Sequence, residues 1–91
     1  MRETADPDGR RVTLDAASWA HIIGRHDVLE FHLEDLLRAV SQPDRRMPGR
    51  RADEEFYYLA GAGPSLWIKV VVHYEQNQGR IVTAFPRRRF P

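Results

Sequence analysis

The first half of the chain carries apolar residues at the spacing of an amphipathic helix. Trp19, Ile22 and Ile23 recur at intervals of three and four, so that they share one side of a helix. Asp15 precedes them and is a residue type that caps helix N-termini, whereas Gly24 is a residue type that ends helices. We therefore expect a first helix that starts after Asp15 and ends at Gly24.

The same pattern continues and predicts a second helix over residues 28–41. Its apolar side is formed by Leu29, Leu33, Leu36, Leu37 and Val40. The helix ends at Gln42-Pro43-Asp44, because proline cannot continue the helical hydrogen-bond ladder. Residues 43–53 are rich in Pro, Gly, Arg and Asp and are expected to form a loop.

The second half of the chain has the pattern of strands instead. Aromatic and β-branched runs predict strands over residues 55–60, 66–74 and 80–85, and residues 11–14 alternate enough to add a short edge strand. Short turns join the last three strands, which predicts an antiparallel meander. The expected fold is α+β, with two N-terminal helices packed on a three- to four-stranded antiparallel β-sheet.

The 91 residues allow one domain. Residues 1–10 contain the turn-forming run Asp6-Pro7-Asp8-Gly9 and are expected to be a flexible N-terminus, which leaves residues 11–91 as the domain. The chain has no cysteine, which excludes disulfides, thiolate nucleophiles and cysteine-bound zinc. No apolar run is long enough to cross a membrane and the first residues are polar, so we expect a cytoplasmic protein, or one that is exported by a route other than a signal peptide.

The central predicted strand has two faces of different character. One face is apolar and is assigned to the core: Leu66, Ile68, Val70, Val72 and Tyr74. The other face is formed by Trp67, Lys69, Val71 and His73. A tryptophan, a lysine and a histidine on one face are typical of a ligand-binding surface, although an exposed lysine and histidine near a sheet edge also fit this pattern.

Charge is divided unevenly along the chain, although the net charge is only +1. Residues 1–44 carry five arginines against nine acids, whereas residues 45–91 carry eight arginines and Lys69 against four acids. Arg45–Arg46, Arg50–Arg51 and Arg87–Arg88–Arg89 are basic clusters that could hold a polyanion by counterion release. Lys69 is the only lysine among fourteen basic residues. Codon bias explains abundant arginine equally well, but it does not explain the lysine.

His21, Arg25 and His26 form the densest polar group of the chain. His21 and Arg25 are four residues apart and share a helix face, and Gly24 lets the chain turn His26 toward them. Two histidines beside an arginine could act as base and acid on a phosphodiester. A capping histidine and a surface arginine on a short helix also fit these residues. Zinc is not expected, because the two histidines are five residues apart and no glutamate lies between them.

The order of these motifs resembles a known nuclease group, the phage-type branch of the barnase–EndoU–colicin E5/D–RelE-like (BECR) nucleases. The resemblance covers residues 12–87 and rests on Val12-Thr13-Leu14, Trp19-x-His21-Ile22, Arg25-His26, Gln42-Pro43-Asp44, Phe56-Tyr57-Tyr58, the run 66–72 and the run 79–85. It implies a helix-plus-antiparallel-sheet fold that cleaves RNA without a metal or other cofactor. In such enzymes the ribose 2′-hydroxyl attacks phosphorus and a 2′,3′-cyclic phosphate results.

The resemblance also implies roles for individual residues. His21 and His26 are the expected acid–base pair and Arg25 holds the phosphate. Lys69 neutralises the phosphorane, and Thr83 bonds the phosphate or orients a histidine.

The substrate-binding residues that we expect around this centre are Tyr57, Trp67, His73, Arg80 and Arg87. The sequence thus predicts a small endoribonuclease that acts as a toxin-like effector on RNA such as tRNA or mRNA. Such an enzyme needs an inhibitor, and an acidic antitoxin or immunity protein would fit the arginine-rich half. The alternative is a catalytically inactive RNA- or protein-binding module of the same fold. A structural phage domain is a third hypothesis, which leaves the two histidines and Arg25 without a role.

Overall fold

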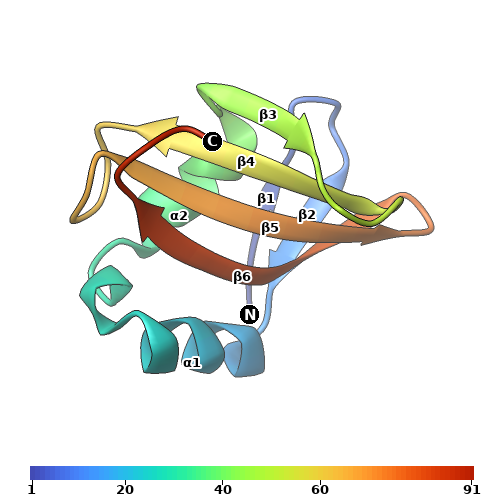
Figure 1. Cartoon of the computed structure of the whole chain (residues 1–91). Coiled ribbons are helices and arrows are strands. Elements are labelled where there is room, and N and C mark those ends of the chain that lie inside the picture. The colour runs from blue at the N-terminus through green and yellow to red at the C-terminus, as the bar shows by residue number, and fades with distance from the viewer.

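The structure, a computed structural model, describes residues 1–91 as one mixed β-sheet with two α-helices and a short 3₁₀ helix. The strands are β1 (Arg2–Ala5), β2 (Arg11–Leu14), β3 (Arg45–Pro48), β4 (Glu54–Ala60), β5 (Trp67–Glu75) and β6 (Gln78–Arg87). The helices are α1 (Ala16–Arg25), the 3₁₀ helix η1 (Asp27–Leu29) and α2 (Leu33–Ser41). The sheet has six strands in the order β1-β2-β6-β5-β4-β3. Figure 1 shows α2 behind the sheet and α1 beside β6.

The expected three- to four-stranded antiparallel sheet is wrong, because the sheet has six strands and is mixed. β2 runs parallel to β6, with Val12 opposite Gly79, whereas all other neighbours are antiparallel. β1 lies in the segment expected to be flexible, and β3 lies in the expected loop. Both are four-residue edge strands in which no residue is buried, so neither has the apolar alternation that would signal a strand.

The first helix starts after Asp15 as predicted, but it continues past Gly24 to Arg25, with His26 as its C-cap residue. The Asp15 side chain accepts a hydrogen bond from the Ser18 backbone N–H at 2.7 Å, as the predicted N-cap should. The second helix is shorter than predicted. Residues 27–29 form η1, and α2 begins only at Leu33. Glu34 and Asp35 lie in the first turn of α2, where negative charge interacts favourably with the positive end of the helix dipole. None of the helices has the length and apolar character needed to span a bilayer.

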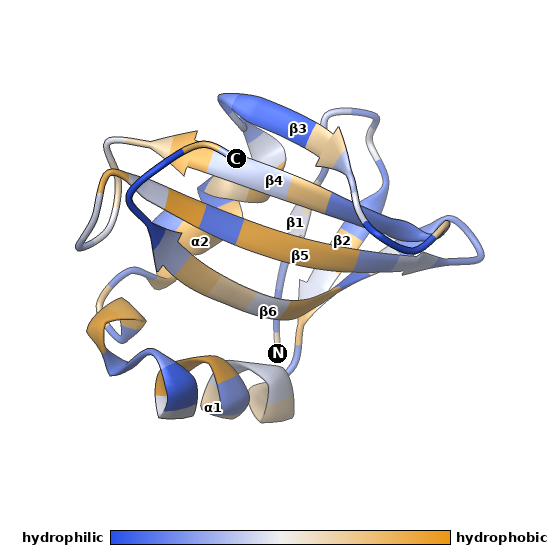
Figure 2. Ribbon diagram, viewed as in Figure 1, coloured by the Kyte–Doolittle hydropathy of each residue, from blue (hydrophilic) through white to orange (hydrophobic).

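The core lies between the sheet and the helices. Ile68, Val70, Val72 and Tyr74 of β5 belong to it, as the alternation predicts. Leu66 does not, because it precedes β5 in the turn and is 66% exposed. α2 packs on β4, β5 and β1, whereas α1 packs on β6. The other side of β4, β5 and β6 carries no helix, and Figure 2 shows a hydrophilic band near the start of β5 among hydrophobic neighbours. We call this side the open face; its residues are Phe56, Tyr58, Trp67, Lys69, Val71, His73, Thr83 and Phe85.

A buried polar network attaches the N-terminal hairpin to the rest of the sheet. The Asp6 side chain is fully buried at the turn between β1 and β2. Its Oδ2 accepts hydrogen bonds from the Tyr74 hydroxyl at 2.7 Å and from Arg10 Nε at 2.7 Å. The Tyr57 hydroxyl lies 2.6 Å from that of Tyr74. Because Tyr74 uses its own proton on Asp6, Tyr57 is the donor in this hydrogen bond. Burial alone raises the pKa of the Asp6 carboxyl, but the hydrogen bonds from Tyr74 and Arg10 outweigh burial and lower the pKa below its usual value.

The network continues to the far edge of the sheet through Glu55. Arg10 Nη2 donates to Glu55 Oε2 at 2.9 Å, and Arg46 Nε of β3 donates to Oε1 at 2.7 Å. Burial raises the pKa of Glu55, but the two arginines lower it by more, so that the net shift is downward. Residues 6–10 thus make polar contacts with β3, β4 and β5.

Candidate functional site

The open face is built by the register of three strands. Tyr58 of β4 lies opposite Lys69 of β5, and Lys69 lies opposite Phe85 of β6. Directly opposed residues on neighbouring strands point to the same side of a sheet, so the lysine is placed between two aromatic rings. Phe56 is two residues from Tyr58 and shares its face. Lys69 of β5 therefore lies among aromatic rings that come from β4 and β6.

Lys69 is held by aromatic rings rather than by a carboxylate. Its Nζ lies 3.8 Å from the centre of the Phe56 ring, 5.6 Å from that of Tyr58 and 5.4 Å from that of Phe85. These are cation–π distances. None of the ion pairs of the structure includes this lysine. The ammonium group is thus available to an anion that approaches from solvent.

Several charged groups act on this amine. Partial burial lowers the pKa of Lys69, and the positive charges of Arg87 and Arg50 lower it further. The Glu54 carboxylate has the opposite, smaller effect. A lowered pKa means that the neighbouring groups disfavour the charged form, so an arriving anion relieves an unfavourable interaction.

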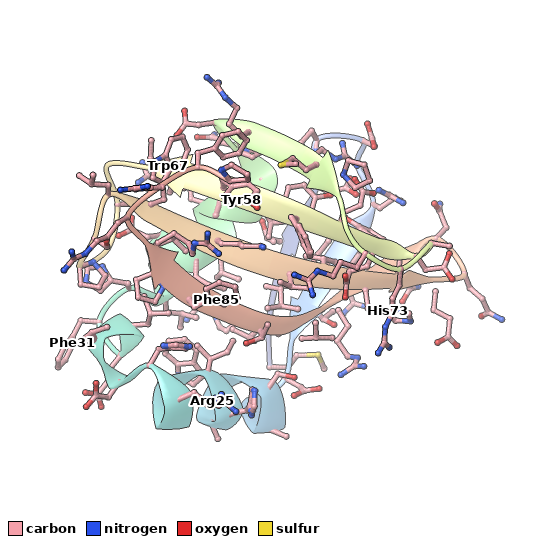
Figure 3. All side chains as sticks on the ribbon, viewed as in Figure 1. Arg25, Phe31, Tyr58, Trp67, His73 and Phe85 are labelled. Atoms are coloured by element: carbon pink, nitrogen blue, oxygen red, sulfur yellow. The ribbon has the colours of Figure 1, made fainter.

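His26 is the predicted catalytic histidine that reaches the open face. It is the C-cap residue of α1, is half-buried, and its ring centre lies 5.9 Å from that of Phe85. Phe85 in turn contacts Lys69, so one aromatic ring links the histidine to the amine. His21 and Arg25 are exposed on α1, which lies below β6 in Figure 3. The contact with Phe85 thus distinguishes His26 from His21.

Thr83 lies beside Lys69 on the diagonal. It is paired with Val71, the residue two positions after Lys69 on the same face of β5. Diagonal neighbours on adjacent strands are about 7–8 Å apart. The pairing shifts between Val71 and Val72, so a β-bulge follows directly. Bulges change the direction of side chains and occur often beside functional sites.

A basic pocket lies at one end of the open face. His73 is paired with Arg80, and both line a pocket of about 310 Å³ together with Arg51, Glu54 and Val82. The two predicted substrate-binding residues His73 and Arg80 are therefore neighbours. Figure 3 shows His73 at the far end of β5 from Trp67. Lys69 and His73 are four strand positions apart, about 13 Å.

An aromatic cluster lies at the other end. Trp67 contacts Tyr58 edge-on, with ring centres 6.3 Å apart. The chain after β6 folds back over this end and places Phe90 against both rings. Arg87, a predicted substrate-binding residue, is paired with Trp67, and its Nη2 donates to the Pro91 carbonyl at 2.7 Å.

Tyr57 is misplaced in the predicted substrate-binding set. It is fully buried in the core, and its hydroxyl belongs to the Asp6 network. Its neighbour Tyr58 faces the open side, because side chains alternate along a strand. The structure adds Phe56, Tyr58, Phe85 and Phe90 to the site. The alternation of β4 signals that Phe56 and Tyr58 share a face, but only the pairing with β5 shows which face it is. No sequence pattern signals Phe90.

Two further observations concern ligands. The largest pocket, about 530 Å³, lies between β1 and α2, away from the open face, and its Arg2 and Glu34 side chains form an ion pair. No three or more His, Cys, Asp or Glu side chains are grouped as a metal site would require.

No known family model, curated protein or solved structure matches the chain.

Proposed function

We propose that this protein is a metal-independent endoribonuclease that binds a single RNA strand along the open face. One observation carries the proposal: the Lys69 ammonium has no carboxylate partner, lies on an aromatic face open to solvent, and is linked to His26 by Phe85. Aromatic rings for bases and cations for phosphates are the combination that single-stranded nucleic acid requires.

The reaction follows from the groups around Lys69. His26 takes the proton of the ribose 2′-hydroxyl, whose oxygen then attacks the adjacent phosphorus. The P–O5′ bond breaks and leaves a 2′,3′-cyclic phosphate. Lys69 stabilises the charge on the phosphorane, and its lowered pKa makes it a better proton donor to the departing 5′-oxygen. Thr83 is close enough to donate a hydrogen bond to a phosphate oxygen. In this assignment His21 and Arg25 take no part in proton transfer, and they contribute only by binding substrate from α1.

The alternative function is binding of RNA without cleavage. The rings and cations of the open face favour it equally, because neither stacking nor phosphate binding needs a base such as His26. Only cleavage needs His26 as a base. Substitution of His26 therefore separates RNA cleavage from RNA binding.

The test is incubation of the purified protein with total RNA and with tRNA in EDTA, followed by analysis of the new ends. Cleavage that leaves cyclic phosphate and is lost in His26→Gln supports the nuclease. His32→Gln is the matched control, because His32 bonds Asp35 on α2 instead of facing the open side. A loss in His21→Gln as large as in His26→Gln would place both histidines in the reaction. Retention of RNA in a gel-shift assay without any cleavage would favour the binding module.

We also propose that the protein acts as a toxin-like effector in the cytoplasm, held in check by an acidic inhibitor that the cations of the open face would attract. An inhibitor that covers Lys69, Arg87 and Arg50 would need carboxylates at matching positions. Expression should stunt the host, and His26→Gln should relieve the effect. Equal growth of cells that express either protein at the same level would contradict this role.

A further inference from the structure

The segment after β6 crosses the open face and ends over its aromatic cluster. The Phe90 ring lies edge-on to Tyr58, with centres 4.8 Å apart and planes at 81°. The same ring is tilted by 35° over Trp67 at 5.4 Å. Arg45 of β3 lies 5.7 Å from the Phe90 ring centre. Figure 3 shows Trp67 and Tyr58 side by side on the strands beneath this segment.

Phe90 packs against Tyr58, a residue of the open face that is almost completely buried. Tyr58 is on the open face, outside the core cluster, and yet is only 1% exposed. The Trp67 and Phe90 rings both contact it edge-on, and burial raises the pKa of Tyr58. Phe90 itself remains 37% exposed. A partly exposed ring thus covers a buried one.

The segment is weakly held. Arg88 and Arg89 are exposed, and the carbonyl of Pro91 accepts one hydrogen bond from Arg87. An aromatic pair contributes about 0.5–1.5 kcal/mol beyond its burial, so another planar ring of similar area can replace Phe90 at little cost. Trp67 and Lys69 are two positions apart on one face, about 7 Å, which puts the aromatic cluster next to the phosphate position.

We propose that Tyr58 and Trp67 form a subsite for one unpaired nucleobase, and that Phe90 is its internal occupant, which RNA displaces. The inference rests on the proposed function, since it assumes that the ligand is RNA. The base enters where Phe90 lies and stacks on Trp67, while its phosphate lies at Lys69. The segment 88–91 then swings away and brings Arg88 and Arg89 beside the strand.

The experiment compares Phe90→Ala with the wild type, both carrying Trp19→Phe so that Trp67 is the only tryptophan. Acrylamide quenching of its fluorescence reports whether Phe90 covers the ring. A short 2′-O-methyl oligouridylate, which cannot be cleaved by 2′-hydroxyl attack, reports binding. An abasic oligonucleotide of the same length and charge reports the phosphate contribution alone. Phe31→Ala is the matched control, because Phe31 is 89% exposed and lies between η1 and α2.

In Phe90→Ala we expect stronger quenching of Trp67 and oligouridylate binding that is roughly 2- to 10-fold tighter, which corresponds to the loss of one competing aromatic contact. Binding of the abasic oligonucleotide should stay the same, and Phe31→Ala should behave like the wild type. Weaker or unchanged oligouridylate binding in Phe90→Ala overturns the proposal, because Phe90 would then be a partner of the base or a bystander. An equal gain in affinity of Phe90→Ala for the oligouridylate and for the abasic oligonucleotide also overturns the proposal. Cleavage by wild type tests the nuclease separately, since these measurements need binding only.

Discussion

Lys69 of β5 lies directly opposite Tyr58 of β4, with its Nζ 5.6 Å from the centre of the tyrosine ring. The pairing puts the only lysine of the chain on aromatic surface at the middle of the sheet. An ammonium group there keeps its charge exposed to one side only. This is the arrangement on which the proposed chemistry depends.

Lys69→Met should slow cleavage strongly without unfolding the protein. Methionine keeps the length and the contacts with the rings but removes the charge that stabilises the phosphorane. Loss of one such charge-stabilising group lowers kcat by roughly 10²–10³-fold. Single-turnover cleavage rates and the thermal unfolding midpoint measure the two effects. Arg38→Met on the exposed side of α2 is the control for a lost positive charge. Full activity in Lys69→Met would remove this lysine from the reaction.

The pH profile of cleavage should report the lowered pKa of Lys69. The protonated form is the active one in the proposed reaction, and partial burial, Arg87 and Arg50 favour its loss of a proton. Activity should therefore fall on the alkaline side at a pH below the usual lysine value of about 10.4. Lys69→Arg should remove this limb of kcat/KM against pH, because arginine stays charged. An unchanged alkaline limb in Lys69→Arg would assign it to another group.

Asp6→Ala should destabilise the fold by roughly 1–3 kcal/mol, because it leaves the buried Tyr74 hydroxyl without its acceptor and removes one of the partners of Arg10. Asp8→Ala is the matched control. Asp8 is 60% exposed and its ion pair with Arg46 lies at the surface, so its loss should cost less than about 1 kcal/mol. Urea unfolding of the three proteins measures both values. Similar losses for Asp6→Ala and Asp8→Ala would contradict the role of burial.

The same network predicts acid sensitivity. The pKa values of Asp6 and Glu55 are lower in the folded protein than in the unfolded chain. Their contribution to stability is therefore complete above the unfolded values of about 3.9 and 4.3, and is lost as the pH falls through the lower folded values. The free energy of unfolding should drop below about pH 4. Asp6→Ala should lose less on acidification than the wild type, as urea titrations at several pH values would reveal.

Two glycines should respond to alanine in opposite ways. A Cβ at Gly79 would lie 2.9 Å from side-chain atoms of Tyr74, Val12 and Val72, at the parallel pairing of β2 and β6. Gly79→Ala should therefore destabilise the protein by roughly 1–3 kcal/mol. Gly24 in α1 has no atom within 4 Å of such a Cβ, so Gly24→Ala should stabilise the helix by about 0.5–1 kcal/mol. Thermal unfolding compares them directly, and a neutral Gly79→Ala would argue against the β2–β6 pairing.

Local patterns predicted those parts of the molecule that local forces decide. The Asp15 cap and the two faces of β5 can be predicted because each depends on neighbours within a few residues. β1 and β3 cannot, since their charged residues order only through pairing and through the buried Asp6 network.

The candidate site shows the same limit. Lys69 and Trp67 were predicted from alternation within one strand, whereas the choice of Tyr58 over Tyr57 depends on cross-strand register. His26 and His21 look alike in sequence, and only the contact between His26 and Phe85 distinguishes them. Phe90 reaches the site through a reversal of the chain after β6, which has no periodic signal.

The parallel pairing of β2 with β6 has a consequence for how early the sheet can be completed during synthesis. β2 precedes both α-helices in the sequence, whereas its parallel neighbour β6 follows all the other strands of the sheet. Phe85 and Thr83 arrive with that strand, as does the Gly79 position on which β2 closes. A nascent chain without residues 78–87 therefore holds Lys69 on an incomplete sheet. The open face on which the proposed RNA binding depends is therefore complete only after β6 has been synthesised.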